Sequence, residues 1–274
     1  MALRIYISTL SIAIFSLCTS AYDYSANFSY TGSNGPEKWG TLSPDFAACS
    51  NGKAQSPVDI AYPDIVMNME LESLDRDYLS TNATLVNNKF NIGVHFQGQV
   101  VGDININGKN YSLKQLHWHS PAEHRAHGRV HEAELHLVHL TPDNNGIAVV
   151  AVLYNLGDPD PIISQMEDKF VALAKENRAG NKDAQIPIGT FDFEEINART
   201  HSRYYRYVGS LTTPPCKEGV IWNILGKVRT LSKKQLELLK APLSQEYIHN
   251  ARPLQPLNGR KIEMYDHYNH RQGI

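Results

Sequence analysis

The sequence predicts a mainly β protein with a single domain and a few helices on its surface. Over residues 84–154, short runs typical of strands alternate with turn signals, and a similar pattern returns over residues 204–229. No linker divides the 274 residues. At roughly 150 residues per domain the length alone would suggest two domains, but single all-β domains of this size are common.

Four strands are predicted most clearly, at residues 100–106, 111–119, 132–140 and 147–154. Asn107-Gly108 and Asn144-Asn145-Gly146 provide turns after the first and third of them. Residues 22–50, in contrast, are expected to be irregular, because glycine and proline interrupt any regular strand or helix there.

A helix is predicted over residues 161–176, because apolar residues recur there at helical spacing and Gly180 lies just beyond. The strand pattern of residues 204–229 is interrupted at residues 213–215 by Thr-Pro-Pro. A second, short helix follows Ser232, which forms a capping-box pattern with Gln235 ahead of three leucines.

The first 21 residues have the pattern of a secretory signal peptide. Arg4 is the only charged residue before Asp23, and an apolar stretch follows it. Thr19 and Ala21 are small residues at the −3 and −1 positions of a cleavage site. The stretch is short for a membrane span, although a hydrophobic N-terminal anchor is the alternative. We therefore expect a signal peptide at residues 1–21 and a mature chain of residues 22–274.

Composition argues against two classes of function. The formal net charge is −2 and no basic run or basic-aromatic repeat occurs, which argues against nucleic-acid binding. No later stretch approaches about 18 consecutive apolar residues, so we expect no membrane-spanning segment in the mature chain.

Entry into the secretory pathway would allow the cysteines to form a disulfide and the sequons to be glycosylated. Cleavage removes Cys18, and the remaining Cys49 and Cys216 most simply form one disulfide in an oxidising compartment, with two free buried thiols as the alternative. The three N-x-S/T sequons become candidate glycosylation sites, of which we expect one or two to be used; they lie at Asn27, Asn82 and Asn110.

The distribution of histidine indicates a functional site, because seven of the twelve histidines lie between His117 and His139. In a strand over residues 113–119, alternation places Gln115, His117 and His119 on one face and apolar residues on the other.

A strand over residues 133–139 alternates in the same way, with Glu134, His136 and Val138 on one face. If the apolar faces of both strands pack into one core, three imidazoles face a common cavity. Three imidazoles suit zinc, with the fourth tetrahedral position left for water. Gln115 and Glu134 each precede a histidine by two residues and are placed to accept its second ring N–H.

The other histidines of this segment are predicted to be structural or solvated. A lone His-x-His on a strand is more often a pair of solvated histidines than a metal site, so the third histidine on a second strand carries the metal interpretation. His139 lies on the apolar face, and we expect it, like His124, to be buried and hydrogen-bonded. His127 and His131 are expected to be solvated loop residues.

These residues belong to motifs that closely resemble those of the α-class carbonic anhydrases, over residues 28–265. The motifs, in chain order, are NGPEKW (34–39), QSPVDI (55–60), QLHWH (115–119), ELHLVH (134–139), GSLTTPP (209–215) and NARPLQP (250–256). The TPPC and YYRY runs and the Asn82 sequon are similar to those of the plant members.

The resemblance implies a single domain around a central, twisted, mostly antiparallel sheet, with one zinc ion per chain at the floor of a conical cleft. It also implies a disulfide between Cys49 and Cys216, and cis peptide bonds at Ser56-Pro57 and Pro214-Pro215.

The resemblance further implies a role for each residue of the site. The zinc ligands are His117, His119 and His136. Gln115, Glu134 and the backbone carbonyl of Asn250 accept the second ring N–H groups of these ligands.

Three further residues implied by the resemblance take part in catalysis. Thr212 accepts a hydrogen bond from zinc-bound hydroxide and donates its own to Glu123, while Tyr207 joins the network behind Thr212. Thr213 helps to position bicarbonate, and an apolar wall holds carbon dioxide. The members of this wall are Val138, Val149, Leu211 and Trp222.

The implied activity is the reversible hydration of carbon dioxide to bicarbonate and a proton, by a secreted monomer or homodimer. Fast members of the family carry a histidine proton shuttle two residues after an Asn-Asn pair, where this chain has Phe90. His95 is a possible substitute nearer the rim. Without a shuttle we expect slow, buffer-dependent turnover, on the order of 10³–10⁴ per second against about 10⁶.

Two alternatives remain open from the sequence. One is a non-catalytic storage or binding protein on the same fold. The other concerns the compartment: a signal peptide favours an extracellular or cell-wall location, and transport to the chloroplast through the secretory route is the alternative.

Overall fold

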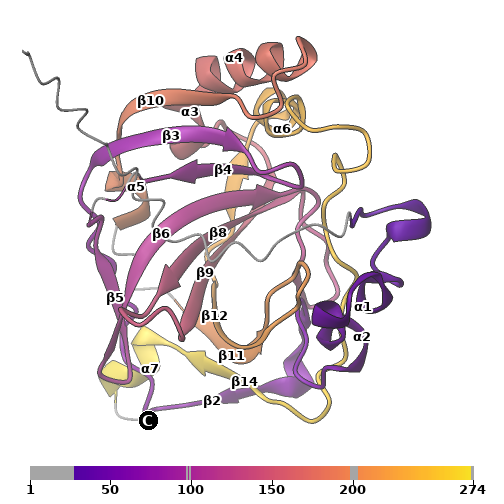
Figure 1. Ribbon diagram of the computed structural model, residues 1–274. Helices are drawn as coiled ribbons and strands as arrows, with labels where there is room; N and C mark the ends of the chain where they lie inside the picture. Colours follow the sequence, from indigo (N-terminus) through magenta and orange to yellow (C-terminus); the bar gives the residue numbers. More distant parts are fainter. Residues whose placement is uncertain (1–27, 97, 99, 198–202, 273–274) are drawn as a thin grey trace, which may run out of the picture.

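The computed structural model describes residues 28–272, apart from residues 97, 99 and 198–202 (Figure 1). The predicted signal peptide and the Asn27 sequon lie outside the described residues.

A twelve-stranded twisted sheet forms the body of the described structure (Figure 1). Ten strands follow the order β10-β3-β4-β6-β8-β9-β12-β11-β14-β2, while β5 pairs with β6 and β13 pairs with β9. The strands of the sheet are β2 (Ile65–Met67), β3 (Thr81–Asn87), β4 (Ile92–His95), β5 (Asp103–Ile106), β6 (Lys109–His119), β8 (Ala133–Leu140), β9 (Ile147–Leu156), β10 (Gln185–Phe191), β11 (Tyr204–Ser210), β12 (Glu218–Leu225), β13 (Arg229–Leu231) and β14 (Ile262–Tyr265).

Most neighbouring strands of this sheet are antiparallel, as predicted, but β9 pairs in parallel with β12 and β13, and β14 pairs in parallel with β2. A separate parallel pair joins β1 (Asp59–Ile60) and β7 (Arg125–Ala126).

The helices are short and lie around the sheet (Figure 1). They are α1 (Trp39–Leu42), α2 (Ala48–Asn51), α3 (Pro161–Ser164), α4 (Glu167–Arg178), α5 (Glu194–Asn197), α6 (Lys233–Lys240) and α7 (His267–Gln272), with 3₁₀ turns at Gly32–Asn34, Pro44–Phe46 and Tyr62–Asp64. The capping box predicted for α6 is confirmed, because the Ser232 side chain accepts from the Gln235 N–H and the Gln235 side chain accepts from the Ser232 N–H.

The single helix predicted over residues 161–176 is wrong, because α3 and α4 are separate. Met166 has φ −139° and ψ 22°, which is not helical. The apolar spacing that predicted the helix is nevertheless the buried set, since Ile162, Met166 and Phe170 are all buried. The apolar spacing therefore identified the buried face of both helices. It gave no indication of the break between them.

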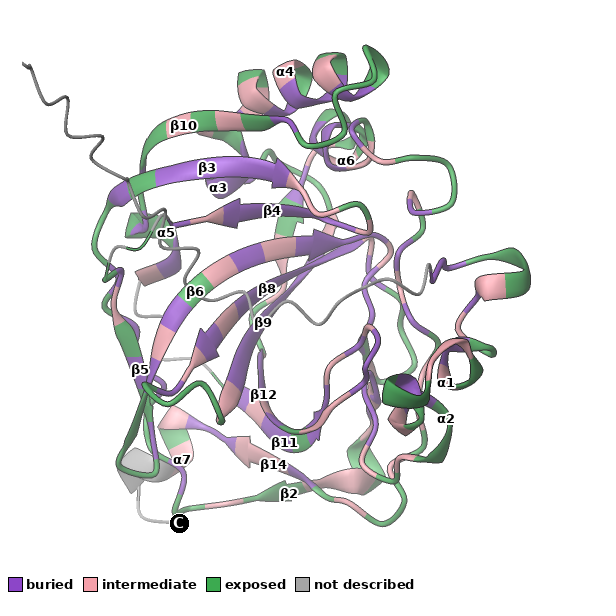
Figure 2. Ribbon diagram, viewed as in Figure 1, coloured by how far each residue is buried: buried purple, intermediate pink, exposed green. Residues whose placement is uncertain are grey.

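The segment expected to be irregular contains α1, α2 and two 3₁₀ turns, so that prediction was also wrong in part. The edge strand β10 was missed as well. It contains Pro187 and Gly189, and its register against β3 shifts between them, so its sequence does not alternate cleanly. Figure 2 shows little burial along β10, in contrast to the central strands.

The central strands are buried on both faces (Figure 2). On one face of β6 and β8, Leu116, Trp118, Leu135 and Leu137 belong to one large apolar core, which confirms that the apolar faces of the two strands pack together. A second apolar cluster, including Val149 and Trp222, lies on the other face.

His139 is buried in the core and hydrogen-bonded, as predicted. Its Nε2 lies 2.7 Å from the Tyr78 hydroxyl and its Nδ1 lies 3.3 Å from the Ala148 carbonyl oxygen. Because a carbonyl can only accept, Nδ1 carries the proton and Nε2 accepts from Tyr78. Burial lowers the pKa of His139 to about 3.

This lowered pKa predicts acid sensitivity. Between about pH 6.5 and pH 3 the unfolded chain binds a proton at this position and the folded chain does not, so each pH unit of acidification removes about 1.4 kcal/mol of stability. The His139→Gln variant should be less stable at pH 7, yet should lose about 3 kcal/mol less than the unmodified chain between pH 6.5 and pH 4.

Urea unfolding at several pH values, with a chelator present, measures this difference. His127→Gln is the control, because His127 is exposed and stacks on Tyr62, and this variant should follow the unmodified chain. Equal pH slopes for the unmodified chain and His139→Gln would contradict the prediction.

Candidate metal centre

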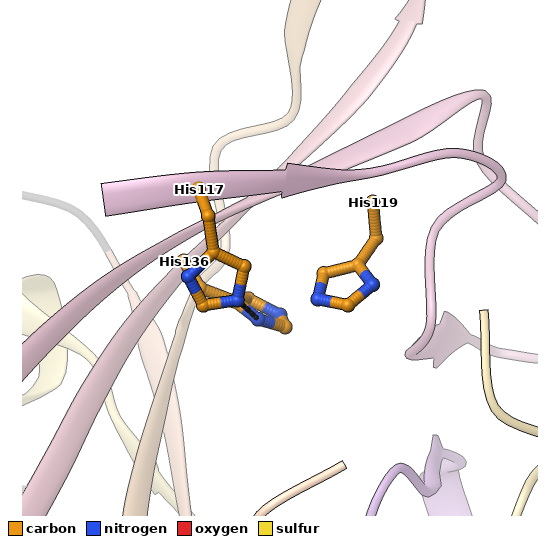
Figure 3. A group of neighbouring side chains, drawn as sticks. All are labelled: His117, His119 and His136. Carbon is orange, nitrogen blue, oxygen red and sulfur yellow. Dashed lines mark hydrogen bonds between the residues drawn. The ribbon is translucent and has the colours of Figure 1, made fainter. Parts of the chain in front are cut away.

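The register between β6 and β8 brings three histidines together. His117 lies directly opposite His136 in this antiparallel pair, and His119 lies two residues farther along the same face of β6. The three rings converge on one point (Figure 3). One ring nitrogen of each residue lies within 4.8 Å of the other two.

Hydrogen bonds on the outer side of each ring determine its tautomer. His117 Nδ1 lies 2.9 Å from Gln115 Oε1, and His119 Nδ1 lies 2.6 Å from the Asn250 carbonyl oxygen. His136 Nε2 lies 2.8 Å from Glu134 Oε1. Each partner atom can only accept, so each of these ring nitrogens carries the proton.

Three nitrogen lone pairs therefore face one another. His136 Nδ1 lies 3.3 Å from His117 Nε2, the contact drawn in Figure 3, but with these tautomers neither atom has a proton to donate. His119 Nε2 is buried and has no hydrogen-bond partner among the described residues. A cation resolves this arrangement, since two nitrogens at about 2.05 Å from one tetrahedral ion are about 3.3 Å apart.

Burial keeps all three rings neutral near pH 7. It lowers the pKa of His119 to about 4, and it lowers the pKa of His117 still more clearly, with the neighbouring His119 and His136 adding to the effect. The pKa of His136 is also lowered by burial, although Glu134 opposes this change. Neutral imidazole is the form that binds metal.

Glu134 is the acceptor that holds this part of the site together. Its Oε2 accepts from the backbone N–H groups of Glu123 and His124, and its Oε1 accepts from His124 Nδ1 as well as from His136. Although burial opposes ionisation, the two histidines hold the pKa of Glu134 well below its ordinary value. Glu134 is therefore an anion that fixes two imidazole rings.

A hydrogen-bonded chain continues behind Glu134. His124 Nε2 accepts from the Tyr207 hydroxyl at 2.7 Å, and the Tyr207 oxygen lies 2.8 Å from Ser56 Oγ. The prediction that His124 is buried and hydrogen-bonded is confirmed. Tyr207 contacts Ser56 and His124, so it joins the network through Glu134.

Glu123 and Thr212 are both buried beside the cluster. Glu123 Oε1 accepts from the backbone N–H of Arg252, and Oε2 lies 3.5 Å from His119 Nε2. Burial raises the pKa of Glu123 to about 7, and its interaction with the Thr212 side chain works in the opposite direction. Thr213 is half-buried, and its carbonyl accepts from the Cys216 N–H.

The four residues named for the apolar wall all belong to the apolar cluster on the histidine face. Val138 lies opposite Val149, Val149 opposite Trp222, and Trp222 opposite Tyr207, so one row crosses four strands. At the other end of this row, Gln115 lies opposite His95.

Cys49 in α2 and Cys216 form a disulfide, as predicted. The bond joins the segment that precedes the sheet to the residues directly after Pro214-Pro215, and both cysteines pack in an aromatic cluster with Trp39. The cis peptide bonds predicted at Ser56-Pro57 and Pro214-Pro215 are also present, together with one at Ser120-Pro121 that was not predicted.

Phe90 is half-buried and packs against this aromatic cluster, with its ring centre 5.2 Å from that of Phe28. His95 is half-buried, and its Nε2 is buried with no hydrogen-bond partner among the described residues. Asn82 and Asn110 of the two described sequons are exposed.

Two positions were assigned wrongly or missed from the sequence. His131 was expected to be solvated, but it is buried. Its Nδ1 lies 2.8 Å from Asn155 Oδ1 near the end of β9. Arg252 was not singled out, although its guanidinium donates to Gln55, Ser56 and Cys49 while its backbone holds Glu123. Its place in the NARPLQP motif was the only available signal.

Three histidines converge on one face of a large twisted sheet, with their ring nitrogens placed as a candidate metal site. Residues 34–266 match the sequence model of a family described as eukaryotic-type carbonic anhydrase. The chain belongs to the α-carbonic anhydrase family.

Plant relatives cover most of the chain. It is 40% identical over 239 residues to alpha carbonic anhydrase 7 of Arabidopsis thaliana, covering 87% of this chain and 84% of that protein. It is 35% identical over 272 residues to dioscorin dioA3 of Dioscorea japonica, covering 98% and 97%. A crystal structure of dioscorin complexed with ascorbate superposes with a TM-score of 0.81 at 37% identity, covering 88% of this chain and 98% of that chain.

The plant relatives and the disulfide are typical of a protein of the secretory pathway. Within the described ranges, no helix has the length and apolar character needed to cross a membrane.

Glu134 provides a test of this geometry that does not depend on metal. In Glu134→Gln, an amide NH₂ faces ring N–H groups that need an acceptor, so the free energy of unfolding should fall by about 2–4 kcal/mol. Urea unfolding with a chelator present measures the change. Glu132→Gln is the matched control two residues earlier, because the half-buried Glu132 carboxylate accepts no hydrogen bond from a described residue. Equal stability of the two variants would contradict the network.

Proposed function

We propose that the protein catalyses the reversible hydration of carbon dioxide to bicarbonate and a proton, with one zinc ion per chain. The carrying observation is the set of three converging lone pairs on His117, His119 and His136. Three neutral imidazoles leave one tetrahedral position open, which is typical of catalytic rather than structural zinc sites. Membership of the family supports the same assignment.

In carbonic anhydrases, bound zinc lowers the pKa of a water molecule to about 7, a value known from that enzyme class and not from this structure. This chain's residues then orient the reactants. Thr212 donates a hydrogen bond to the Glu123 carboxylate, which leaves the lone pairs of its own oxygen to accept a hydrogen bond from the attacking nucleophile. The Arg252 N–H on Glu123 Oε1 supports this role by leaving Oε2 on the side of the histidines.

Carbon dioxide is apolar, and the wall formed by Val138, Val149, Leu211 and Trp222 suits it, because these residues pack together on the histidine face. Thr213 follows Thr212 directly and is assigned to the positioning of bicarbonate. The Ser56–Tyr207–His124 chain holds Glu134, and through it His136, in one orientation.

Proton removal is proposed to limit the turnover. Phe90 cannot carry a proton, and its position is that of the histidine shuttle in fast members of the family. His95 has an unpartnered Nε2, but burial lowers its pKa, so it is mostly unprotonated near pH 7 and relays protons poorly. The proton is therefore transferred to water or to buffer.

The remaining assignments rest on the sequence. We propose residues 1–21 as a signal peptide, residues 22–274 as one domain, and a secreted monomer or homodimer located in the extracellular space or cell wall. Exposure supports Asn82 and Asn110 as glycosylation sites. The non-catalytic alternative, a storage or binding protein on this fold, is tested below.

Metal analysis tests the centre directly. The chain should contain about one zinc ion, and His119→Ala should lose at least 100-fold in zinc affinity and all measurable carbon dioxide hydration. His131→Ala removes a buried histidine that is not part of the cluster and should retain its zinc. Zinc without turnover, or no zinc at all, would favour the storage or binding class.

The shuttle position is tested by Phe90→His. Stopped-flow hydration in dilute buffer should be on the order of 10³–10⁴ per second for the unmodified chain, rising severalfold with added imidazole. Phe90→His should raise the rate in dilute buffer about tenfold and reduce the effect of imidazole. His95→Gln should leave both values unchanged. A rate above about 10⁵ per second for the unmodified chain in dilute buffer would refute this account.

A further inference from the structure

A pocket lies on the face of the sheet opposite the three histidines. Its floor includes Leu137 of β8, Val150 and Val152 of β9 and Leu225 of β12. Leu137 lies opposite Val150, one residue along from the pair of His136 and Ala151. Because side chains alternate along a strand, these floor residues point away from the histidine cluster. The two sites therefore share strands but not a face.

The charged walls of the pocket are unevenly neutralised. Arg229 contacts two carboxylates, with Nε 2.7 Å from Asp160 and Nη2 3.1 Å from Glu195. Lys227 is exposed at the pocket and forms no ion pair with any residue in the described ranges. Asp160 and Glu195 are thus both paired with Arg229, whereas Lys227 adds an unpaired positive charge to the wall.

Arg76 is the unusual member of this lining. Its side chain is buried, with the residue only 8% exposed, and its Nε donates to the Ile196 carbonyl at 3.1 Å. Its two terminal nitrogens form no hydrogen bond or ion pair with a described residue. Burial lowers the pKa of Arg76, and its neighbours Asp75 and Tyr78 offset this only in part. A buried guanidinium that has no ion-pair partner in contact and whose charge is only partly offset by Asp75 is costly, so an anion that reaches it is bound favourably.

We propose that this pocket binds a small monocarboxylate with a compact apolar body. The carboxylate pairs with the terminal nitrogens of Arg76, whose planar fork matches its two oxygens. The apolar body lies on Val152, Ile196 and Leu225, which are lining residues that retain exposed surface. The volume open to water-sized molecules is about 70 Å³, room for roughly five to seven waters, which suits an aromatic or short aliphatic acid. No part of this site depends on the metal centre or on the proposed hydration activity.

Benzoate is the probe. In NMR spectra of the full chain, its ring protons should give NOEs to the methyl groups of Val152, Ile196 and Leu225. Carboxylates are also metal ligands, so the titration is done on zinc-loaded protein and on the His119→Ala chain, and the NOEs should appear in both. Benzyl alcohol, which lacks the charge, should bind at least tenfold more weakly.

Arg76→Gln should weaken benzoate binding at least tenfold, whereas Arg178→Gln, which changes an exposed arginine of α4, should leave the affinity unchanged. Leu225→Trp fills the pocket while leaving Arg76 in place, and it should abolish the NOEs even if Arg76→Gln does not fold. The proposal is overturned if the NOEs are absent at millimolar benzoate, if they persist in Leu225→Trp, or if a folded Arg76→Gln binds as tightly as Arg178→Gln.

Discussion

The register between β6 and β8 is the constraint on which the site depends. It places His117 opposite His136, and a slip of one residue would turn one set of imidazoles into the core and bring leucine to the histidine face. The apolar side chains on the opposite face resist such a slip, because Leu116, Trp118, Leu135 and Leu137 are almost completely buried in one core. The free energy that maintains the histidine geometry therefore comes largely from residues that never touch it.

Burying so many polar groups on one sheet face is stable only because most of them have a fixed partner. The outer N–H groups of the three rings donate to Gln115, Glu134 and the Asn250 carbonyl. The Tyr207 hydroxyl donates to the remaining ring nitrogen of His124. The lone pairs left over are concentrated at one point. This spacing of three lone pairs matches the ligand set of a single metal ion.

The sequence was sufficient for the parts of the structure that alternate. The faces of β6 and β8 and the partners Gln115 and Glu134 followed from period-two patterning. β9 was predicted as a strand without an assignment of its faces, and the capping box located α6. Prediction failed where long-range contacts decide. The edge strand β10 with its bulge and the burial of His131 against Asn155 depend on neighbours that are distant in sequence. Arg252 was missed for the same reason, since its partners lie about 200 residues earlier in the chain. The break at Met166 left no mark in the apolar spacing.

Phe90, at the position proposed for a proton shuttle, supports the histidine cluster through its backbone. Its carbonyl oxygen accepts from Asn250 Nδ2 at 2.9 Å, and the Asn250 carbonyl in turn holds His119. This positioning uses only the backbone at residue 90, so it is independent of the side chain. The side chain packs instead with the aromatic cluster around the disulfide. A titratable group at this position would serve proton transfer and lose apolar contact, whereas phenylalanine favours packing. The proposed metal centre and the proposed proton path are therefore separable, because the three histidines belong to strands of the sheet and Phe90 does not.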